Sequence, residues 1–475
     1  MRGDATGRTF QPMNDAADLG VTDAAALLAD RRLSAVELTE ACLRRIEERN
    51  GAVSFDGAPD AINAWVRVYP ELALAQARAA DERRAAEGEA APRLCGVPLA
   101  LKDLYGAAGL PLTASSRVLE GNVAPHDAAV WARLRNAGMV LLGHTHAHEF
   151  AAGGTTDQVG NPWATDLTAG GSSGGSAAAL AARMTPAALG SDTCGSLRIP
   201  SACCGTSTIK PTHGRLPLAG IIPLAPTLDH PGPMARTLAD CALLLEAMTA
   251  GEPEITELAL TPRPGSRPLA ATRIAVTDLA SRADLDPATA AGLKTARDAC
   301  KQLGATVVEL AAPAAVDWDD LSVVLLTESW SYHRRHAARR HLYRPAIAEY
   351  VEAAARFTDA QAYLAAQRRR SELSAKWHRW YAEYGIDLVL EPTLPIVPYA
   401  RGTGYERGHA GGAGDPMIAL TALWNLTGMP VASLPVTWNV GVSLVAPAGR
   451  ERPLVQAAVD LQEHALGIPE FGPAG

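Results

Sequence analysis

The sequence predicts an α/β fold, and two features carry this prediction. Residues 272–277 and 306–310 are strand-like, and the segment between them, 287–303, is predicted to be a helix. A strand–helix–strand order of this kind is typical of α/β sheets. Hydrophobic residues make up 48% and charged residues 20% of the 475 positions, the composition of a globular protein with a large core.

The composition also limits the partners that the chain is expected to have. The net charge of −8 argues against nucleic-acid binding, which requires a basic surface. No run of 18 apolar residues is present, so we expect no membrane span, and the first twenty residues lack the apolar core of a secretory signal. The seven cysteines form no C-x-x-C pair and are typical of reduced thiols in a cytoplasmic protein: Cys42, Cys95, Cys194, Cys203, Cys204, Cys241 and Cys300.

The N-terminal part begins with a predicted flexible arm, residues 1–20. Ser34 and Glu37 have the spacing of a capping box, which predicts the start of a helix with Leu38, Cys42 and Ile46 on its apolar face. Further helices are predicted over 70–88, 129–138 and 322–384, and strands over 139–142 and 220–223.

A lysine stands at the end of a predicted buried strand. Residues 97–101 are apolar throughout, and Lys102 follows them directly. Buried lysines are rare unless they are paired or take part in chemistry. The residues alone leave two interpretations open, because the long side chain could also reach the solvent.

Three histidines alternate in the next segment, at His144, His146 and His148. On a strand this spacing would place them on one face, where they could bind a metal. The sequence places no further Asp, Cys or His to complete a ligand set, so we predict neither a metal nor another cofactor.

Residues 170–200 form the most informative segment of the chain. Two glycine-rich turns carry serines, the first at Ser172 and Ser173 and the second at Ser196, and an apolar run over 176–184 predicts a buried helix between them. Glycines let backbone N–H groups converge, so each turn can present a serine beside an oxyanion hole. A phosphate-binding loop and a plain surface loop are the alternatives, although the segment matches no phosphate-binding motif.

This segment resembles the signature of the amidase signature family of serine hydrolases. The matching elements are GGSSGGS at 170–176, the stretch 190–200, the Cys204-Gly205 pair and Lys210-Pro211-Thr212. Outside the signature, GVPLALKD at 96–103 resembles the family's lysine motif, and LDHPGPM at 228–234 and PTLP at 392–395 resemble two later motifs. The resemblance extends from about residue 23 to the C-terminus. One departure is Cys194, where the family usually has glycine.

The resemblance implies the fold and the catalytic residues. It implies one large α/β/α domain over 21–475, with a mixed, mostly parallel, twisted sheet, and hydrolysis of C–N bonds in small-molecule amides through an acyl-enzyme. In this pattern Ser196 is the nucleophile, Ser172 is a bridging serine with a cis peptide bond, and Lys102 is the base. The oxyanion hole would consist of the N–H groups of Thr193, Cys194, Gly195 and Ser196. Three further residues would hold the two turns in register: Ser173, Asp192 and Arg198.

The substrate and the assembly stay open at this point. The same chemistry serves carbamate (urethane) hydrolases and the transamidase subunit of tRNA-dependent amidotransferases, although residues 328–333 lack a stretch that those subunits carry. A homodimer is also left open. Residues 402–414 hold six glycines and are predicted to form a mobile loop at the mouth of the site. Closing such a loop favours aryl or bulky apolar substrates, because their burial offsets the cost of ordering it.

Overall fold

The computed structural model describes residues 15–249, 263, 265, 267–403 and 415–470. Residues 1–14 of the predicted arm and 404–414 of the predicted loop lie outside the described residues. The described end of the arm is anchored, because Ala17 is buried and the Asp15 carboxylate pairs with the Arg45 guanidinium.

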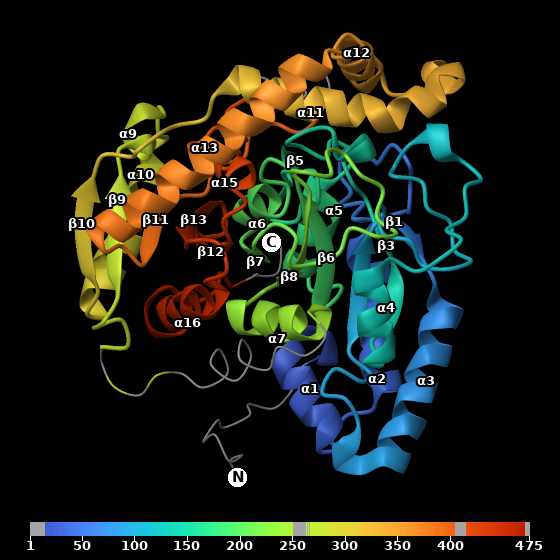
Figure 1. The fold of residues 1–475 in the computed structure, drawn as a ribbon. Helices are drawn as coiled ribbons and strands as arrows, with labels where there is room; N and C mark the ends of the chain where they lie inside the picture. The colour runs from blue at the N-terminus through green and yellow to red at the C-terminus, as the bar shows by residue number, and fades with distance from the viewer. Residues whose placement is uncertain (1–14, 250–262, 264, 266, 404–414, 471–475) are drawn as a thin grey trace.

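An eleven-stranded mixed sheet organises the described chain (Figure 1). From one edge to the other its strands are β1 (Trp65–Val68), β3 (Val140–Thr145), β2 (Pro98–Lys102), β6 (Ala187–Asp192), β8 (His230–Ala235), β7 (Ser207–Lys210), β12 (Val431–Thr437), β13 (Val440–Val445), β11 (Leu388–Pro392), β9 (Arg273–Thr277) and β10 (Thr306–Leu310). A separate hairpin consists of β4 (Gly160–Asn161) and β5 (Ala164–Thr168).

The α/β class and the mixed sheet are confirmed, but the share of parallel pairs is smaller than predicted. Four neighbouring pairs of described strands are parallel, namely β3–β2, β2–β6, β11–β9 and β9–β10. The other six pairs are antiparallel, and they lie mainly in the middle of the sheet. One physical reason is the short connection between β12 and β13, since a two-residue link joins strands only in an antiparallel hairpin.

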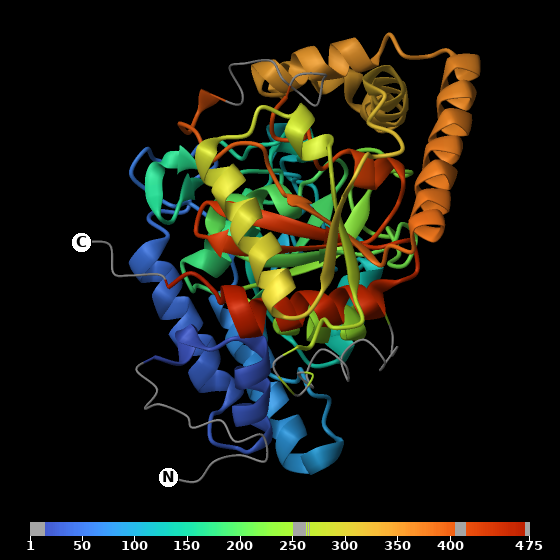
Figure 2. The ribbon, with the colours of Figure 1, turned by 90° about the vertical axis from the view of Figure 1, so that its left-hand side faces the viewer.

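The predicted strand–helix–strand unit is present at one edge of the sheet. Strand β9 pairs in parallel with β10, with Arg273 opposite Thr306, and α10 (Pro287–Gln302) connects them. The Asp286 carboxylate caps the first turn of this helix by accepting a hydrogen bond from the N–H of Ala288. Figure 2 shows α10 lying across the strands of this edge.

The helices cover the sheet on both sides. In Figure 1, α7 and α16 lie together below it, while α11 and α13 pass above it. The helices are α1 (Val21–Ala29), α2 (Ala35–Arg49), α3 (Pro70–Glu87), α4 (Ala129–Asn136), α5 (Gly174–Ala181), α6 (Arg198–Cys204), α7 (Leu238–Met248), α9 (Leu279–Arg282), α10, α11 (Trp318–His333), α12 (Pro345–Ala354), α13 (Ala360–Tyr384), α15 (Leu423–Leu426) and α16 (Glu451–Leu461).

Two local predictions have opposite outcomes. The capping box of α2 is confirmed: the N–H of Glu37 donates to the Ser34 hydroxyl, and the Glu37 carboxylate accepts from the N–H of Ser34. The strand predicted over 220–223 is wrong. Only Ile221 makes an isolated bridge, to Tyr105, because Gly220 turns the chain with φ +80° and Pro223 has no N–H to donate.

Helix α5 holds the first serine turn rigidly in the core. All eight of its residues are buried, as the apolar run predicts. A Cβ atom at Gly175 would lie 2.5 Å from the carbonyl oxygen of Ala64, so only glycine lets the helix approach the neighbouring chain this closely.

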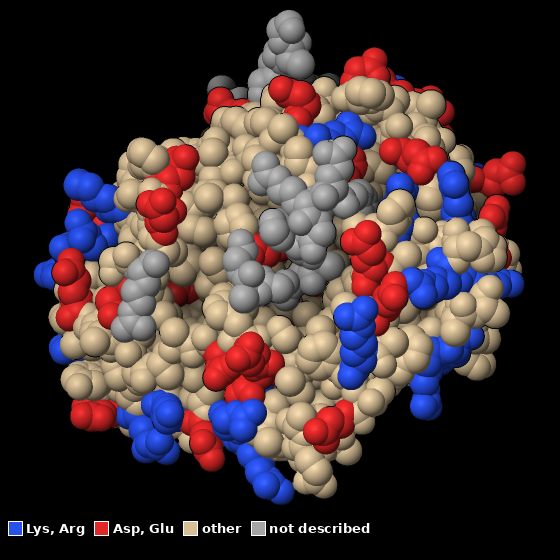
Figure 3. Space-filling view, turned by 90° about the horizontal axis from the view of Figure 1, so that it is seen from above, with Lys and Arg blue, Asp and Glu red and all other residues tan. Residues whose placement is uncertain are grey.

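The surface of the described chain carries charges of both signs. Figure 3 shows acidic and basic side chains interspersed on the upper face of the molecule. Among the described residues, no helix combines the length and apolar character needed to span a bilayer.

Candidate active site

Two neighbouring parallel strands bring the candidate groups together. Lys102 is the last residue of β2, and Ser191 and Asp192 are the last residues of β6. Because β2 and β6 run parallel as neighbours, their carboxyl ends lie at the same edge of the sheet. This edge is the usual place for ligand sites in α/β proteins.

The amine nitrogen of Lys102 lies among three serine hydroxyls. Its Nζ is 2.7 Å from Ser172 Oγ, 2.9 Å from Ser173 Oγ and 2.9 Å from Ser191 Oγ. The side chain is fully buried, which excludes the alternative that it reaches solvent. The Gly171–Ser172 peptide bond is cis, as the resemblance implies. Sequence reasoning missed Ser191, because its place beside Lys102 depends on the pairing of β6 with β2.

The positions of the hydroxyl protons decide which groups around Lys102 donate hydrogen bonds and which accept them. Ser173 donates its proton to the carbonyl oxygen of Ser191, at 3.2 Å, so its oxygen accepts a hydrogen bond from Lys102. A neutral lysine has two N–H donors and one lone pair. If Ser173 and Ser191 accept the two donors, the lone pair faces Ser172 Oγ and can take its proton.

Burial lowers the pKa of Lys102 to about 7, although the carboxylates of Asp192 and Asp229 oppose the shift. A large fraction of the amine is therefore neutral near pH 7 to 8, where an exposed lysine would be almost fully protonated. This is the state in which the amine can act as a base.

The second serine turn connects β6 to α6 and contains Ser196. The N–H of Gly195 donates to the Asp192 carboxylate at 2.8 Å, so this group is already used within the turn. The predicted oxyanion hole, which included the N–H of Gly195, is corrected to the other three groups. Among the described residues we find no acceptor for the N–H groups of Thr193, Cys194 and Ser196. Gly195 has φ +133°, a conformation that favours glycine.

A buried ion pair fixes the shape of this turn. The Arg198 guanidinium donates two hydrogen bonds to the Asp192 carboxylate, both at 2.9 Å, and both side chains are fully buried. Burial opposes ionisation of Asp192, but Arg198 more than offsets it and holds the pKa of this carboxyl well below its usual range. Asn425 binds both partners, at 2.7 Å from Arg198 and 2.8 Å from Asp192. No role at the site was predicted for Asn425, which lies more than 220 positions further along the chain.

A second carboxylate supports the turn from the other side. The Thr193 hydroxyl donates to Asp229 at 2.6 Å, and Asp229 also accepts from the N–H groups of Leu224 and Ala225. Sequence reasoning placed Asp229 in a family motif but gave it no role. These contacts hold Thr193, whose N–H belongs to the proposed oxyanion hole, in one position.

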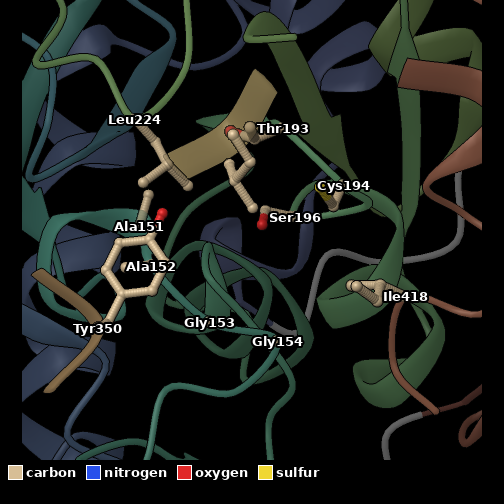
Figure 4. A pocket seen from close by; sticks show the side chains of 11 residues that line it. Ala151, Ala152, Gly153, Gly154, Thr193, Cys194, Ser196, Leu224, Tyr350 and Ile418 are labelled. Atoms are coloured by element: carbon tan, nitrogen blue, oxygen red, sulfur yellow. The ribbon is translucent and has the colours of Figure 1, made fainter. Parts of the chain in front are cut away.

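The Ser196 side chain faces a pocket with a neutral and largely apolar lining (Figure 4). Its walls come from the second serine turn, from the loop at 151–154, from α11 and α12 and from the chain before α15. The lining residues are Ala151, Ala152, Gly153, Gly154, Thr193, Cys194, Ser196, Leu224, Leu325, Tyr350 and Ile418.

Cys194 is part of the pocket wall, and its carbonyl accepts a hydrogen bond from the Thr421 hydroxyl. Burial raises the pKa of its thiol well above the ordinary value. The thiol is therefore protonated at neutral pH, which makes Cys194 a poor competitor of Ser196 as nucleophile.

The three histidines serve separate parts of the structure. His144 contacts the Tyr69 hydroxyl and the Tyr105 carbonyl, each at 3.0 Å, while His146 contacts the Ser54 carbonyl and His148 the Thr155 carbonyl. Burial lowers the pKa of His146 and of His148 to about 3. Within the described ranges, no group of three or more His, Cys, Asp or Glu side chains is arranged to hold a metal ion.

The family model described as amidase matches residues 37–455 of this chain. The chain belongs to the amidase signature family of hydrolases. Curated relatives include a Glutamyl-tRNA(Gln) amidotransferase subunit from Methylococcus capsulatus, 35% identical over 89% of this chain and 91% of its own. The corresponding protein from Azotobacter vinelandii is 36% identical over 92% of this chain and 95% of its own.

Solved structures of other members share the fold. The 6-aminohexanoate cyclic dimer hydrolase, in complex with its substrate, superimposes with a TM-score of 0.80 at 29% identity, covering 95% of this chain and 98% of its own. The peptide amidase of Stenotrophomonas maltophilia gives a TM-score of 0.79 at 26% identity, covering 94% of this chain and 97% of its own. These likenesses confirm the predicted family and the α/β fold.

Proposed function

We propose that this chain is an amidohydrolase in which Ser196 is the nucleophile, Ser172 relays protons and Lys102 is the base. The observation that carries the proposal is the buried amine of Lys102, 2.7 Å from Ser172 Oγ, with its pKa lowered to about 7. A serine hydroxyl is a weak nucleophile unless a base removes its proton. A lysine that is largely neutral near physiological pH meets this need.

The reaction begins when Ser172 gives its proton to Lys102 and takes the proton of Ser196. Ser196 Oγ then attacks the carbonyl carbon, and the N–H groups of Thr193, Cys194 and Ser196 stabilise the oxyanion. The C–N bond breaks as the relay returns a proton to the leaving amine. Water then hydrolyses the acyl-enzyme by the same route, which releases the acid and restores Ser196.

The lining of the pocket supports the proposed substrate class. Its described lining contains no Lys, Arg, Asp or Glu, so a charged group bound there would lose its hydration without a partner. Leu224, Leu325 and Ile418 offer apolar contact instead. We therefore assign aryl or other bulky apolar amides as substrates, with carbamates as the alternative for the same residues. One relative of known structure is named a peptide amidase, which supports the amide.

A substrate panel with active-site variants tests the proposal. Aryl amides, aliphatic amides and aryl carbamates are compared by amine or ammonia release. Ser196→Ala, Ser172→Ala and Lys102→Ala should each lower kcat by several orders of magnitude, because members of a relay act as a unit. Ser201→Ala is the matched control, since it removes another buried serine hydroxyl from the same segment, one without a hydrogen-bond partner in the described structure. If Ser196→Ala kept more than about a tenth of the rate that Ser201→Ala shows, the triad assignment would be wrong.

The sequence identity of 35–36% with amidotransferase subunits favours a second candidate function, that of the transamidase subunit of a tRNA-dependent amidotransferase. Residues 328–333 lack a stretch typical of those subunits, and the Glu328 carboxylate is engaged inside this chain. It accepts hydrogen bonds from the N–H and hydroxyl of Thr227 and from the Tyr363 hydroxyl. Stoichiometric co-purification with a second subunit, together with activity only in that complex, would favour this candidate over the stand-alone hydrolase.

A further inference from the structure

The hydroxyl of Tyr350 lies in the pocket but takes no part in the proposed reaction of Ser196, Ser172 and Lys102. Tyr350, on α12, lines the pocket together with Ser196, and the residue is 5% exposed. Its hydroxyl has no hydrogen-bond partner among the described residues. A buried phenol hydroxyl without a partner is unusual, because such groups are nearly always satisfied.

The surroundings of this hydroxyl explain why it stays unsatisfied within the protein. The side chains of Ala151, Ala152 and Leu224 face the same space and offer no acceptor (Figure 4). Burial raises the pKa of Tyr350, and the Ser329 hydroxyl on α11 opposes this shift, yet the two hydroxyls do not reach hydrogen-bond geometry. The hydroxyl of Tyr350 is therefore an unpaired donor in the wall of a pocket with a largely apolar lining.

From these contacts we infer that Tyr350 is a substrate-positioning residue that donates a hydrogen bond to a neutral acceptor atom in the apolar part of the substrate. An ether, ester or carbonyl oxygen satisfies the donor, whereas a carboxylate would be a charge without a counter-ion in this lining. The inference rests on the proposed function and deepens it, because it selects amides or carbamates whose bulky group carries one oxygen acceptor.

A hydrogen bond from Tyr350 to the substrate would make the enzyme selective for substrates that carry an oxygen acceptor at that position. A site built to hydrogen-bond a substrate atom discriminates against analogues that lack the atom, since its own polar group is then buried without a partner. The all-carbon analogue of the substrate should bind in the same pocket but should react more slowly.

A fluorophosphonate series tests this inference without knowledge of the natural substrate. The parent probe carries an unbranched alkyl chain, and in each isostere one methylene is replaced by an ether oxygen at a different position. Ser196 Oγ bonds to phosphorus, the P–F bond breaks with loss of fluoride, and the serine proton passes through Ser172 to Lys102. The second-order rate of inactivation is measured for each probe with the wild type, Tyr350→Phe and Tyr343→Phe.

In the wild type, one oxygen position should react about three- to tenfold faster than the parent, the range for one neutral hydrogen bond. Tyr350→Phe should abolish that preference, so that the parent and the ether probes react at equal rates, and an unchanged melting temperature shows that the variant is folded. Tyr343→Phe is the matched control. It removes a buried phenol hydroxyl that bonds to His333, 2.8 Å away, and lines no part of the pocket, so the preference should persist.

Each other result overturns the inference. A wild type without a preferred oxygen position means that water or the Ser329 hydroxyl satisfies Tyr350. An equal loss with the parent and the ether probes means that Tyr350 has only a structural role. If wild type and Ser196→Ala are labelled equally, the proposed function itself fails, and the inference fails with it.

Discussion

Ser191→Ala removes one of the three hydroxyls around Lys102 and changes only the environment of the base. The Ser191 oxygen lies 2.9 Å from Lys102 Nζ, while Ser172 and Ser173 keep their own contacts with the amine. The variant therefore asks whether the hydroxyl cluster tunes the lysine, independently of the nucleophile.

The size and direction of the effect follow from the two protonation states. A hydrogen bond to a charged group contributes about 1.5–3 kcal/mol and a neutral one about 0.5–1.5 kcal/mol, so losing Ser191 destabilises the charged amine by about 1 kcal/mol more than the neutral amine. One pKa unit corresponds to about 1.4 kcal/mol, which gives a decrease of about 0.7 unit. The pKa of Lys102 should fall from about 7 into the range between 6 and 7.

The pH dependence of kcat/KM measures this pKa in the free enzyme. In the wild type, activity should rise with pH through about 7 and then level off, because only the neutral amine accepts a proton. In Ser191→Ala the midpoint should move to lower pH, and Ser191→Thr, which retains a hydroxyl, should restore it. An unchanged midpoint, or one that moves to higher pH, would refute the idea that this hydroxyl stabilises the charged lysine.

Three further predictions concern the support of the site. Arg198→Ala should lower the free energy of unfolding by about 3–5 kcal/mol and abolish activity, because it leaves the Asp192 carboxylate buried without its counter-ion; a thermal shift of less than about 2 °C would contradict this. Cys194→Gly should raise the kcat/KM ratio of bulky over small acyl groups about tenfold, since a side chain leaves the pocket wall, and an unchanged ratio would show that the wall does not select. Dialysis against a chelator should leave activity intact, whereas a loss that zinc restores would return the histidines to consideration.

The sequence predicted the local parts of the site better than their surroundings. Lys102, Ser172 and Ser173 were predicted from two short motifs, and the structure places both serine hydroxyls at 2.7 and 2.9 Å from the lysine nitrogen. Ser191 was missed because its role depends on β6 lying beside β2, a pairing that periodicity does not reveal. The commitment of the Gly195 N–H to Asp192 was missed for a similar reason, since the direction of a backbone N–H depends on the turn geometry.

Long-range contacts account for the remaining differences. Asn425 and Tyr350 reach the site from segments that are far away in sequence, and no role at the site was predicted for either. The same distinction between local and long-range contacts applies to the order of the strands. The β9–α10–β10 unit is local and was predicted, whereas the antiparallel centre of the sheet joins β6, β8, β7 and β12 across large sequence separations.

The central claim is that Ser196 forms a covalent acyl-enzyme, and trapping that intermediate tests it most directly. The wild type is mixed with an excess of an activated aryl ester, quenched in acid within milliseconds, digested and mapped by mass spectrometry. The account predicts one acyl group per chain, attached to Ser196, and none in Ser196→Ala. Acylation of Cys194 or Ser172 instead, or turnover without any acylated peptide, would contradict it.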